Sequence, residues 1–321
     1  MKPCALVTFA HLPSKLLLVI CYRLCHEPSS SWHLRTAEPP KVKSLMSDLR
    51  QQVIAPPQGW KPLDVAELWR FRSLLNIFVW RDLKVRYKQS ALGLTWVVLQ
   101  PLALTIVYSV FFGYIARIPS EGVPYPVFFL GGMILWQFFS NTLMQGAISL
   151  TSQQALITKI YFPRALAPLS VVVSSLVDFG VMFLLLIGVM AFYRVAPTAG
   201  IVYAPFFALM AALLAFAVCL WLSAIDAMYR DARYALAFIV QLWYFGTPII
   251  YPLSLVPEKW RFIFLFNPMA AFVMGFRWAM LGDTAPPQMR LIVSGVAVTL
   301  ILLITGAFFF RRVEQRVVDV I

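Results

Sequence analysis

Long apolar segments alternate with short charged segments along most of this chain. An α-helix needs roughly 20 apolar residues to cross a bilayer, and uninterrupted segments of about this length cover residues 92–116, 127–150, 165–192, 201–225 and 291–310. A further apolar segment begins near Tyr234 and is interrupted by Gly246, Pro248 and Pro252. Helix-breaking residues are tolerated inside membrane proteins. The pattern therefore predicts an all-α integral membrane protein with six transmembrane helices.

Two segments are only partly apolar. Residues 67–89 carry apolar side chains at helical spacing among many Arg and Lys. This segment is too charged to span a bilayer, so we expect an N-terminal amphipathic interface helix in the headgroup layer. Packing of the same helix on a partner protein is the alternative, and both can hold at once. Residues 256–288 are half apolar, and we expect them to form re-entrant external helices before the last span.

The composition agrees with a membrane protein. Hydrophobic residues make up 60 % of the 321 residues and charged residues 13 %, against about 45–50 % and about 25 % in soluble domains. A soluble protein of this size could not cover so much apolar side chain. The composition therefore excludes an ordinary soluble enzyme, a disordered protein and a disulfide-rich scaffold.

The net charge of +13 is best explained by the membrane as well. No nucleic-acid-binding signature is present, so nucleic acid is not an expected partner. Cytoplasmic loops of membrane proteins carry an excess of Lys and Arg beside anionic lipids. With both termini placed in the cytoplasm, most basic residues fall inside. The external segments then hold Arg117, Arg194, Lys259, Arg261, Arg277 and Arg290.

The first residues do not fit this organisation. Residues 26–44 are rich in Pro, Ser and His, a composition typical of disorder. Met46 opens a stretch that resembles an ordinary cytoplasmic start, so we expect residues 1–45 to be a mis-assigned or disordered extension. Residues 46–90 would form a cytoplasmic leader with the interface helix, and residues 91–321 the six-span domain.

The sequence carries few candidates for chemistry. It has no phosphate-binding G-x-x-x-x-G-K-[ST] loop, no HExxH or GxSxG motif and no paired-cysteine metal pattern, so we expect no metal site and no catalytic residue. Asp226 and Asp231 each have an arginine nearby and are interpreted as salt-bridge partners. Asp178 lies deep in a predicted span, and we favour a hydrogen-bonded packing role over a role in proton transport.

A basic run precedes the first span. Several cations held at headgroup level suit phosphate binding at the inner leaflet, although positive-inside anchoring alone would also explain them. The candidate phosphate contacts are Arg81, Lys84, Arg86 and Lys88.

Five stretches resemble, in the same order, landmarks of the permeases of bacterial polysaccharide-export ABC transporters, which are type-two ABC exporters. They are VWRDLKVRYKQSALGLTWVVLQP at 79–101, LITKIYFPRALAPL at 156–169, YRDARYAL at 229–236, GTPIIYP at 246–252 and FNPMAAFVMGFRWAMLG at 266–282. The resemblance covers about Pro56 to the C-terminus.

The resemblance implies a homodimer in the bacterial cytoplasmic (inner) membrane. Each subunit would dock on a separate ABC ATPase subunit that binds ATP and Mg²⁺, while this chain would bind no cofactor and catalyse nothing. The implied substrate is a polyprenyl-diphosphate-linked glycan such as O-antigen, capsule, teichoic acid or another polyol phosphate. Its diphosphate would meet the basic run at the inner entrance, among the membrane lipids.

The resemblance also implies roles for later residues. The segment between the second and third spans, about Thr151 to Pro163, would form a coupling helix that fits a groove on the ATPase. The expected coupling residues are Lys159, Ile160, Tyr161, Phe162, Pro163 and Arg164. Aromatic faces would stack on sugars in the channel, although interfacial belts are the alternative use of aromatics. The candidate channel aromatics are Trp243, Tyr244, Tyr251 and Trp260.

Two other functions remain open at this stage. A type-two ABC exporter of a drug or another lipid would have the same fold. A membrane-embedded transferase acting on a polyprenyl phosphate is less favoured, because it would need clustered loop carboxylates to hold Mg²⁺.

Overall fold

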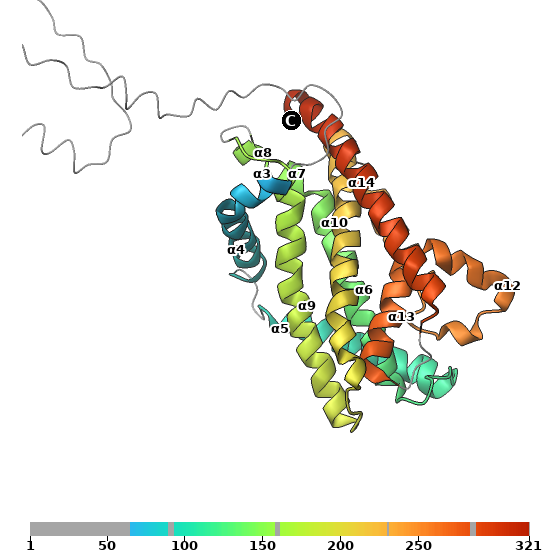
Figure 1. Ribbon diagram of the computed structural model, residues 1–321. Coiled ribbons are helices and arrows are strands. Elements are labelled where there is room, and N and C mark those ends of the chain that lie inside the picture. The colour runs from blue at the N-terminus through green and yellow to red at the C-terminus, as the bar shows by residue number, and fades with distance from the viewer. Residues whose placement is uncertain (1–64, 89–92, 158–160, 230, 283–286, 321) are drawn as a thin grey trace, which may run out of the picture. The chain divides into compact units, whose positions relative to one another are not determined.

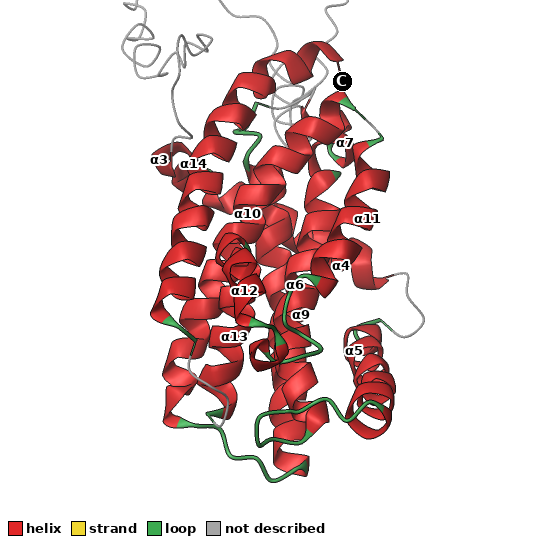
Figure 2. Cartoon of the chain, turned by 90° about the vertical axis from the view of Figure 1, so that its right-hand side faces the viewer, coloured by secondary structure: helices red, strands yellow, loops and turns green. Residues whose placement is uncertain are grey.

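The computed structural model describes residues 65–88, 93–157, 161–229, 231–282 and 287–320. Every regular element in these ranges is helical (Figure 2). The expected extension 1–45, the proposed start at Met46 and most of the leader lie outside the described residues, as do Lys159 and Ile160.

The helices follow one another with short connections (Figure 1). They are α3 (Val65–Arg70), α4 (Arg72–Lys88), α5 (Thr95–Tyr108), the π-helix η1 (Ser109–Ile115), α6 (Tyr125–Ala147), α7 (Ser149–Ser152), α8 (Gln154–Ile157), α9 (Leu166–Phe192), the 3₁₀-helix η2 (Ala199–Tyr203), α10 (Ala204–Met228), α11 (Ala232–Phe245), the 3₁₀-helix η3 (Leu253–Leu255), α12 (Glu258–Arg261), the 3₁₀-helix η4 (Phe262–Phe266), α13 (Pro268–Leu281) and α14 (Met289–Val320).

Five helical segments of the described chain are long and apolar enough to cross a membrane. They are Thr95–Ile115, Tyr125–Ala147, Leu166–Phe192, Ala199–Met228 and Met289–Glu314. Each overlaps a span predicted from the apolar pattern, with its ends displaced by a few residues. The chain is therefore a multi-pass membrane protein.

The fifth expected span, which begins near Tyr234, differs from the prediction. Helix α11 begins where that span was expected but has 14 residues and ends at Phe245, directly before Gly246. At about 1.5 Å per residue it is too short for a hydrocarbon core about 30 Å thick. The half-apolar region forms a broken pair instead, in which Glu258–Phe266 and Pro268–Leu281 are bent by 102°. Counting this pair as one span gives up to six.

Local sequence explains where α13 begins and ends. The Asn267 side-chain oxygen accepts hydrogen bonds from the backbone N–H groups of Met269 at 3.1 Å and Ala270 at 3.3 Å, which caps the helix. Pro268 occupies the first turn, where its missing N–H is not needed. Gly282 follows the last turn with a φ of +71°, a conformation that glycine adopts readily.

Helix α6 is the centre of the core. Of its most apolar window, 83 % is buried, against 11 % for the α5–η1 segment. Helix α6 packs against α9 and α10, and α10 packs in turn against α13 and α14. Figure 2 shows α5 beside this bundle rather than within it. The described core is therefore built by α6, α9, α10, α13 and α14, with α5 on its side.

Candidate substrate path and coupling segment

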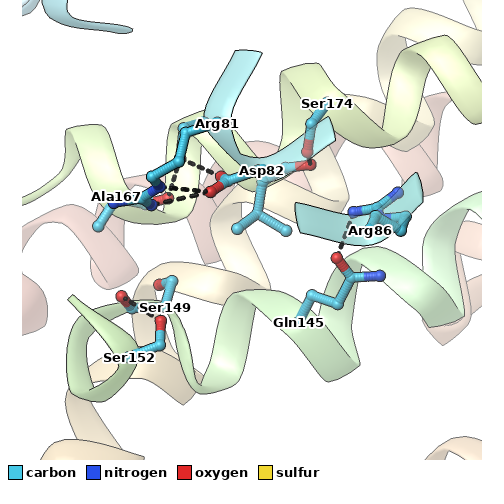
Figure 3. A network of polar contacts seen from close by, with 10 residues as sticks. Arg81, Asp82, Arg86, Gln145, Ser149, Ser152, Ala167 and Ser174 are labelled. Carbon is cyan, nitrogen blue, oxygen red and sulfur yellow. Dashed lines mark hydrogen bonds and ion pairs between the residues drawn. The ribbon is translucent and has the colours of Figure 1, made fainter. Parts of the chain in front are cut away.

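Arg86 connects α4 to two other helices. Its guanidinium donates to the carboxylate of Asp178 on α9 and to the side-chain oxygen of Gln145 on α6, and Figure 3 shows Arg86 pointing toward Gln145. The adjacent Tyr87 donates its hydroxyl to the other oxygen of Asp178. Burial and the neighbouring Asp178 raise the pKa of Tyr87 to about 12, so its hydroxyl keeps its proton and remains a donor.

Asp178 is buried with these partners, its side chain only 9 % exposed. An Asp near the centre of a spanning helix costs about 2.5–3.5 kcal/mol when unsatisfied, and the Arg86 and Tyr87 donors offset that penalty. The hydrogen-bonded environment expected for Asp178 is confirmed. Its partners could not be predicted from the sequence, because they lie about 90 residues away and only tertiary packing brings them together.

The four predicted phosphate contacts divide between two faces of α4. Arg81, Lys84 and Lys88 follow the i, i+3, i+7 spacing of one face, whereas Arg86 points toward α6 and α9. The side chains of Lys84 and Lys88 are exposed. Arg81 donates twice to its neighbour Asp82, at 2.8 and 3.1 Å. Only Arg86 of the four therefore enters the packed interior.

A small cavity of about 190 Å³ lies beside the Arg86–Asp178 pair. Side-chain amides dominate its polar wall, and they come from Gln100 on α5 and from Gln137, Asn141 and Gln145 on α6. The three α6 amides follow i, i+4, i+8 spacing, and Gln137 donates to Asn141 at 3.1 Å. This face of α6 presents neutral hydrogen-bonding groups, which suit a hydroxyl-rich ligand.

A second cavity of about 360 Å³ shares Asn141 with the first. Its wall includes the rings of Tyr108, Trp136 and Tyr244. The Tyr244 ring lies 5.7 Å from Trp136 and 6.4 Å from Tyr108, centroid to centroid. The two cavities thus place an ion pair, a row of amides and a cluster of aromatic rings along neighbouring parts of α6.

The predicted channel aromatics do not form one wall. Tyr244 lines the second cavity, whereas Trp243 packs edge-on against Phe139 at 5.1 Å and donates to Asn267 at 2.9 Å. Tyr251 lies in the loop after α11 and donates to a backbone carbonyl. Trp260 on α12 is 59 % exposed. Only Tyr244 of the four lines a cavity described here.

Sequence reasoning missed Tyr108 and Trp136, which complete the aromatic cluster. A signal was present for Trp136. It directly precedes Gln137, the first residue of the amide row, so it lies beside the face of α6 that turns toward the cavities. Tyr108 had no comparable signal, because the residues directly before it, Ile106 and Val107, are apolar.

The expected coupling residues 161–164 make contacts with other helices of the same chain. Phe162 and Pro163 are buried, and the Phe162 ring meets Phe78 of α4 edge-on at 5.3 Å. The backbone N–H of Arg164 donates to the Glu314 carboxylate of α14 at 3.3 Å, and its guanidinium donates to the Glu314 carbonyl. The segment therefore joins α4 to the end of α14.

Tyr161 of this segment is exposed, with 53 % of its surface accessible. Its hydroxyl donates to Glu67 of α3 at 3.4 Å. Partial burial, with the carboxylates of Glu67 and Glu314 acting in the same direction, raises the pKa of Tyr161. Its hydroxyl therefore keeps its proton and remains a donor to Glu67.

A second contact ties the start of this region to α11. Thr151 of α7 donates to Asp226 at the end of α10 at 3.0 Å. Asp226 also pairs with Arg233 of α11, which confirms the salt bridge expected for Asp226. Asp231 is exposed.

Side chains from other elements hold the loop that follows α11. Three of its carbonyls accept hydrogen bonds: Gly246 from Asn267 at 2.9 Å, Pro248 from Arg277 at 2.6 Å and Ile250 from Tyr125 at 2.9 Å. Non-helical backbone at membrane depth is stable only when protein or water satisfies its polar groups. The side chains of Asn267, Arg277 and Tyr125 satisfy these three carbonyls of the loop.

Arg277 of α13, which the sequence predicts in an external segment, is buried against α6. It is 3 % exposed, and its guanidinium lies 3.8 Å from the centre of the Phe128 ring. Gly132 provides the room, because a Cβ there would lie 2.7 Å from the guanidinium. No group of His, Cys, Asp and Glu in the described residues could hold a metal ion.

Known proteins match this chain over most of its length. The profile of the ABC-2 type transporter family matches residues 73–281. The O-antigen export system permease protein RfbA of Myxococcus xanthus is 32 % identical over 255 residues, which cover 78 % of this chain and 96 % of that protein. RfbA of Klebsiella pneumoniae is 27 % identical over 250 residues, covering 78 % and 95 %.

A more distant relative is the polysialic acid transport protein KpsM of Escherichia coli. It is 21 % identical over 240 residues, which cover 73 % of this chain and 91 % of KpsM. These matches confirm the resemblance inferred from the five sequence landmarks. Together with the helical, multi-pass fold, they establish that the chain belongs to the ABC-2 type transporter family of membrane proteins.

Proposed function

We propose that this chain is the channel-forming transmembrane subunit of an ABC exporter that moves a polyprenyl-diphosphate-linked polysaccharide across the bacterial cytoplasmic membrane. The observation that carries the proposal is the pair of cavities that meet at Asn141. Amides donate to and accept from sugar hydroxyls, and aromatic rings offer apolar faces with specific geometry. The names of the RfbA and KpsM relatives support the same substrate class.

The motor is a separate ATPase subunit that binds ATP and Mg²⁺, because the sequence has no P-loop of its own. The exporter works as a homodimer with both termini in the cytoplasm. The coupling segment meets the ATPase through its exposed side, which includes Tyr161. Lys159 and Ile160 contact the same partner, while Phe162 connects the segment to α4.

The outward face of α4 binds at the membrane surface and meets the substrate's diphosphate. Trp69, Ile77, Trp80 and Val85 are exposed on α3 and α4 beside Lys84. Tryptophan, aliphatic residues and lysine together are typical of interfacial helices. Lys84, whose ammonium lies 5.5 Å from the centre of the Trp80 ring, and Lys88 are both exposed and can contact phosphate oxygens there, with Arg81 at the same face.

Deletion of the gene in its native host tests the function. The surface polysaccharide should disappear while its lipid-linked form accumulates inside the cell, and drug sensitivity should stay unchanged. Gel electrophoresis and immunodetection of the polymer measure the first two effects. Intact surface polysaccharide with raised drug sensitivity would instead identify an exporter of drugs.

Point variants test the proposed phosphate contacts on the outward face of α4. Replacing Lys84 and Lys88 with Ala should lower export while leaving co-purification with the ATPase intact. Arg72→Ala is the matched control, because Arg72 is an exposed cation of the same helix that lies 5.6 Å from the Trp69 ring. Export that stays normal in the Lys84, Lys88 variant contradicts the phosphate role.

A further inference from the structure

The donors around Asp178 form a preformed anion site. Arg86 and Tyr87 direct a guanidinium and a phenol hydroxyl at the two oxygens of one carboxylate, and the remaining arm of Arg86 is held by Gln145. A planar guanidinium with additional hydroxyl and amide groups suits a phosphoryl group as well as a carboxylate. The site is thus filled by an acid from the chain itself.

The surroundings of this site are open on one side. The 190 Å³ cavity is lined by Arg86, Tyr87 and Asp178, so a ligand in it would touch all three groups. Asp178 is the only acid in its lining, and the other polar members are neutral amides. An incoming anion therefore meets the positive guanidinium of Arg86 and competes for it with the Asp178 carboxylate.

We propose that Asp178 occupies the Arg86–Tyr87 anion site in the unloaded transporter, and that a phosphate of the substrate displaces it. This inference rests on the proposed function, since it assigns regulation to that substrate's phosphate. The apparent affinity of a ligand falls by the fraction of protein in which its site is free. Asp178 thus sets how readily Arg86 accepts a phosphoryl group, and its release loosens the link between α4 and α9.

Binding of farnesyl diphosphate to the full-length chain in detergent tests the inference. The probe is a short prenyl diphosphate, and farnesol serves as the phosphate-free control. Asp178→Asn keeps the shape and can still accept hydrogen bonds, but removes the competing charge. If Arg86 is free about one tenth of the time, this change should tighten binding about tenfold.

Matched variants distinguish competition by Asp178 from a general effect of substitution on charge or folding. Arg86→Gln should weaken binding about tenfold or more, because it removes the charge-assisted hydrogen bonds. Tyr87→Phe should weaken it by a few-fold. Asp231→Asn removes the same charge from an exposed position and should leave binding unchanged. Thermal unfolding of each variant confirms that a folded protein is compared.

The outcomes are distinct. An Asp178→Asn variant that binds no tighter than the wild type overturns the inference. Equal binding of farnesyl diphosphate and farnesol by the wild type contradicts the proposed substrate class itself. Phosphatidic acid that displaces the probe equally well, and gains equally from Asp178→Asn, would assign the site to a lipid headgroup and also overturn the inference.

Discussion

The Asp226 carboxylate at the end of α10 accepts two hydrogen bonds from the Arg233 guanidinium of α11, at 3.1 and 3.2 Å. Asp226 is fully buried and is also held by Thr151 of α7. Helix α7 is thereby connected through one carboxylate to α11, the helix that carries Tyr244.

Arg233→Gln should destabilise the chain more than Asp226→Asn. The first change leaves a buried charge with Thr151 alone, whereas the second removes that charge and keeps the shape. We expect a loss of about 2–3 kcal/mol for Arg233→Gln, because its side chain is 40 % exposed and water already screens the pair. Unfolding midpoints in detergent measure both, and the opposite order would contradict the assignment.

Arg277→Met should loosen the loop 246–252. The change leaves the Pro248 carbonyl without its donor and removes the cation from the Phe128 ring. A buried acceptor left unpaired costs about 1–3 kcal/mol, so amide hydrogen exchange in the loop should accelerate by roughly tenfold or more. Arg261→Met is the control, because Arg261 binds a different carbonyl, that of Val256. Exchange that is equal in both variants would refute the role of Arg277.

Gly146→Ala should disturb the contact between α6 and α10. A Cβ at this position would lie 2.2 Å from the sulfur of Cys219, and overpacking of this kind costs about 1–3 kcal/mol. Cys219→Ala in the same chain should restore part of the loss. Gly180→Ala in α9 is the control, since nothing lies within 4 Å of its Cβ. We expect that control to stabilise the helix by about 0.5–1 kcal/mol.

Phe162→Ala and Tyr161→Ala should have different effects, because Phe162 is buried against α4 and Tyr161 is exposed. Removing the buried Phe162 ring should cost about 3–5 kcal/mol and release α4. Removing the exposed Tyr161 side chain should leave stability nearly unchanged and weaken co-purification with the ATPase. Tyr161→Ala with normal co-purification would show that this side chain does not meet the partner.

Tyr244→Ala should reduce polysaccharide export more than Trp260→Ala. Tyr244 lines the cavity beside Trp136, whereas Trp260 lies exposed on α12. An aromatic contact contributes about 0.5–1.5 kcal/mol, so we expect a roughly two- to tenfold lower rate. Export assays at matched protein levels compare the two, and equal losses would place the path elsewhere.

The elements with strong local signals were predictable from the sequence. Asn267, Pro268 and Gly282 mark the ends of α13, and Gly246 marks the end of α11, because capping and helix breaking depend on neighbouring residues. The short length of α11 was not anticipated, since an apolar run looks alike whether its helix crosses a membrane or stops partway. The candidate site depends on contacts between distant segments. The pairing of Arg86 with Asp178 and the burial of Arg277 could not be read from spacing.

The two walls of the cavities differ in how firmly they are held. Helix α6 supplies one wall and is the most deeply buried of the candidate spans, whereas α5 supplies Gln100 and Tyr108 from a segment that is hardly buried at all. Within this subunit, displacing α5 would break few contacts, while displacing α6 would dismantle the bundle. We therefore expect α5, rather than α6, to move aside when a bulky chain of sugars passes.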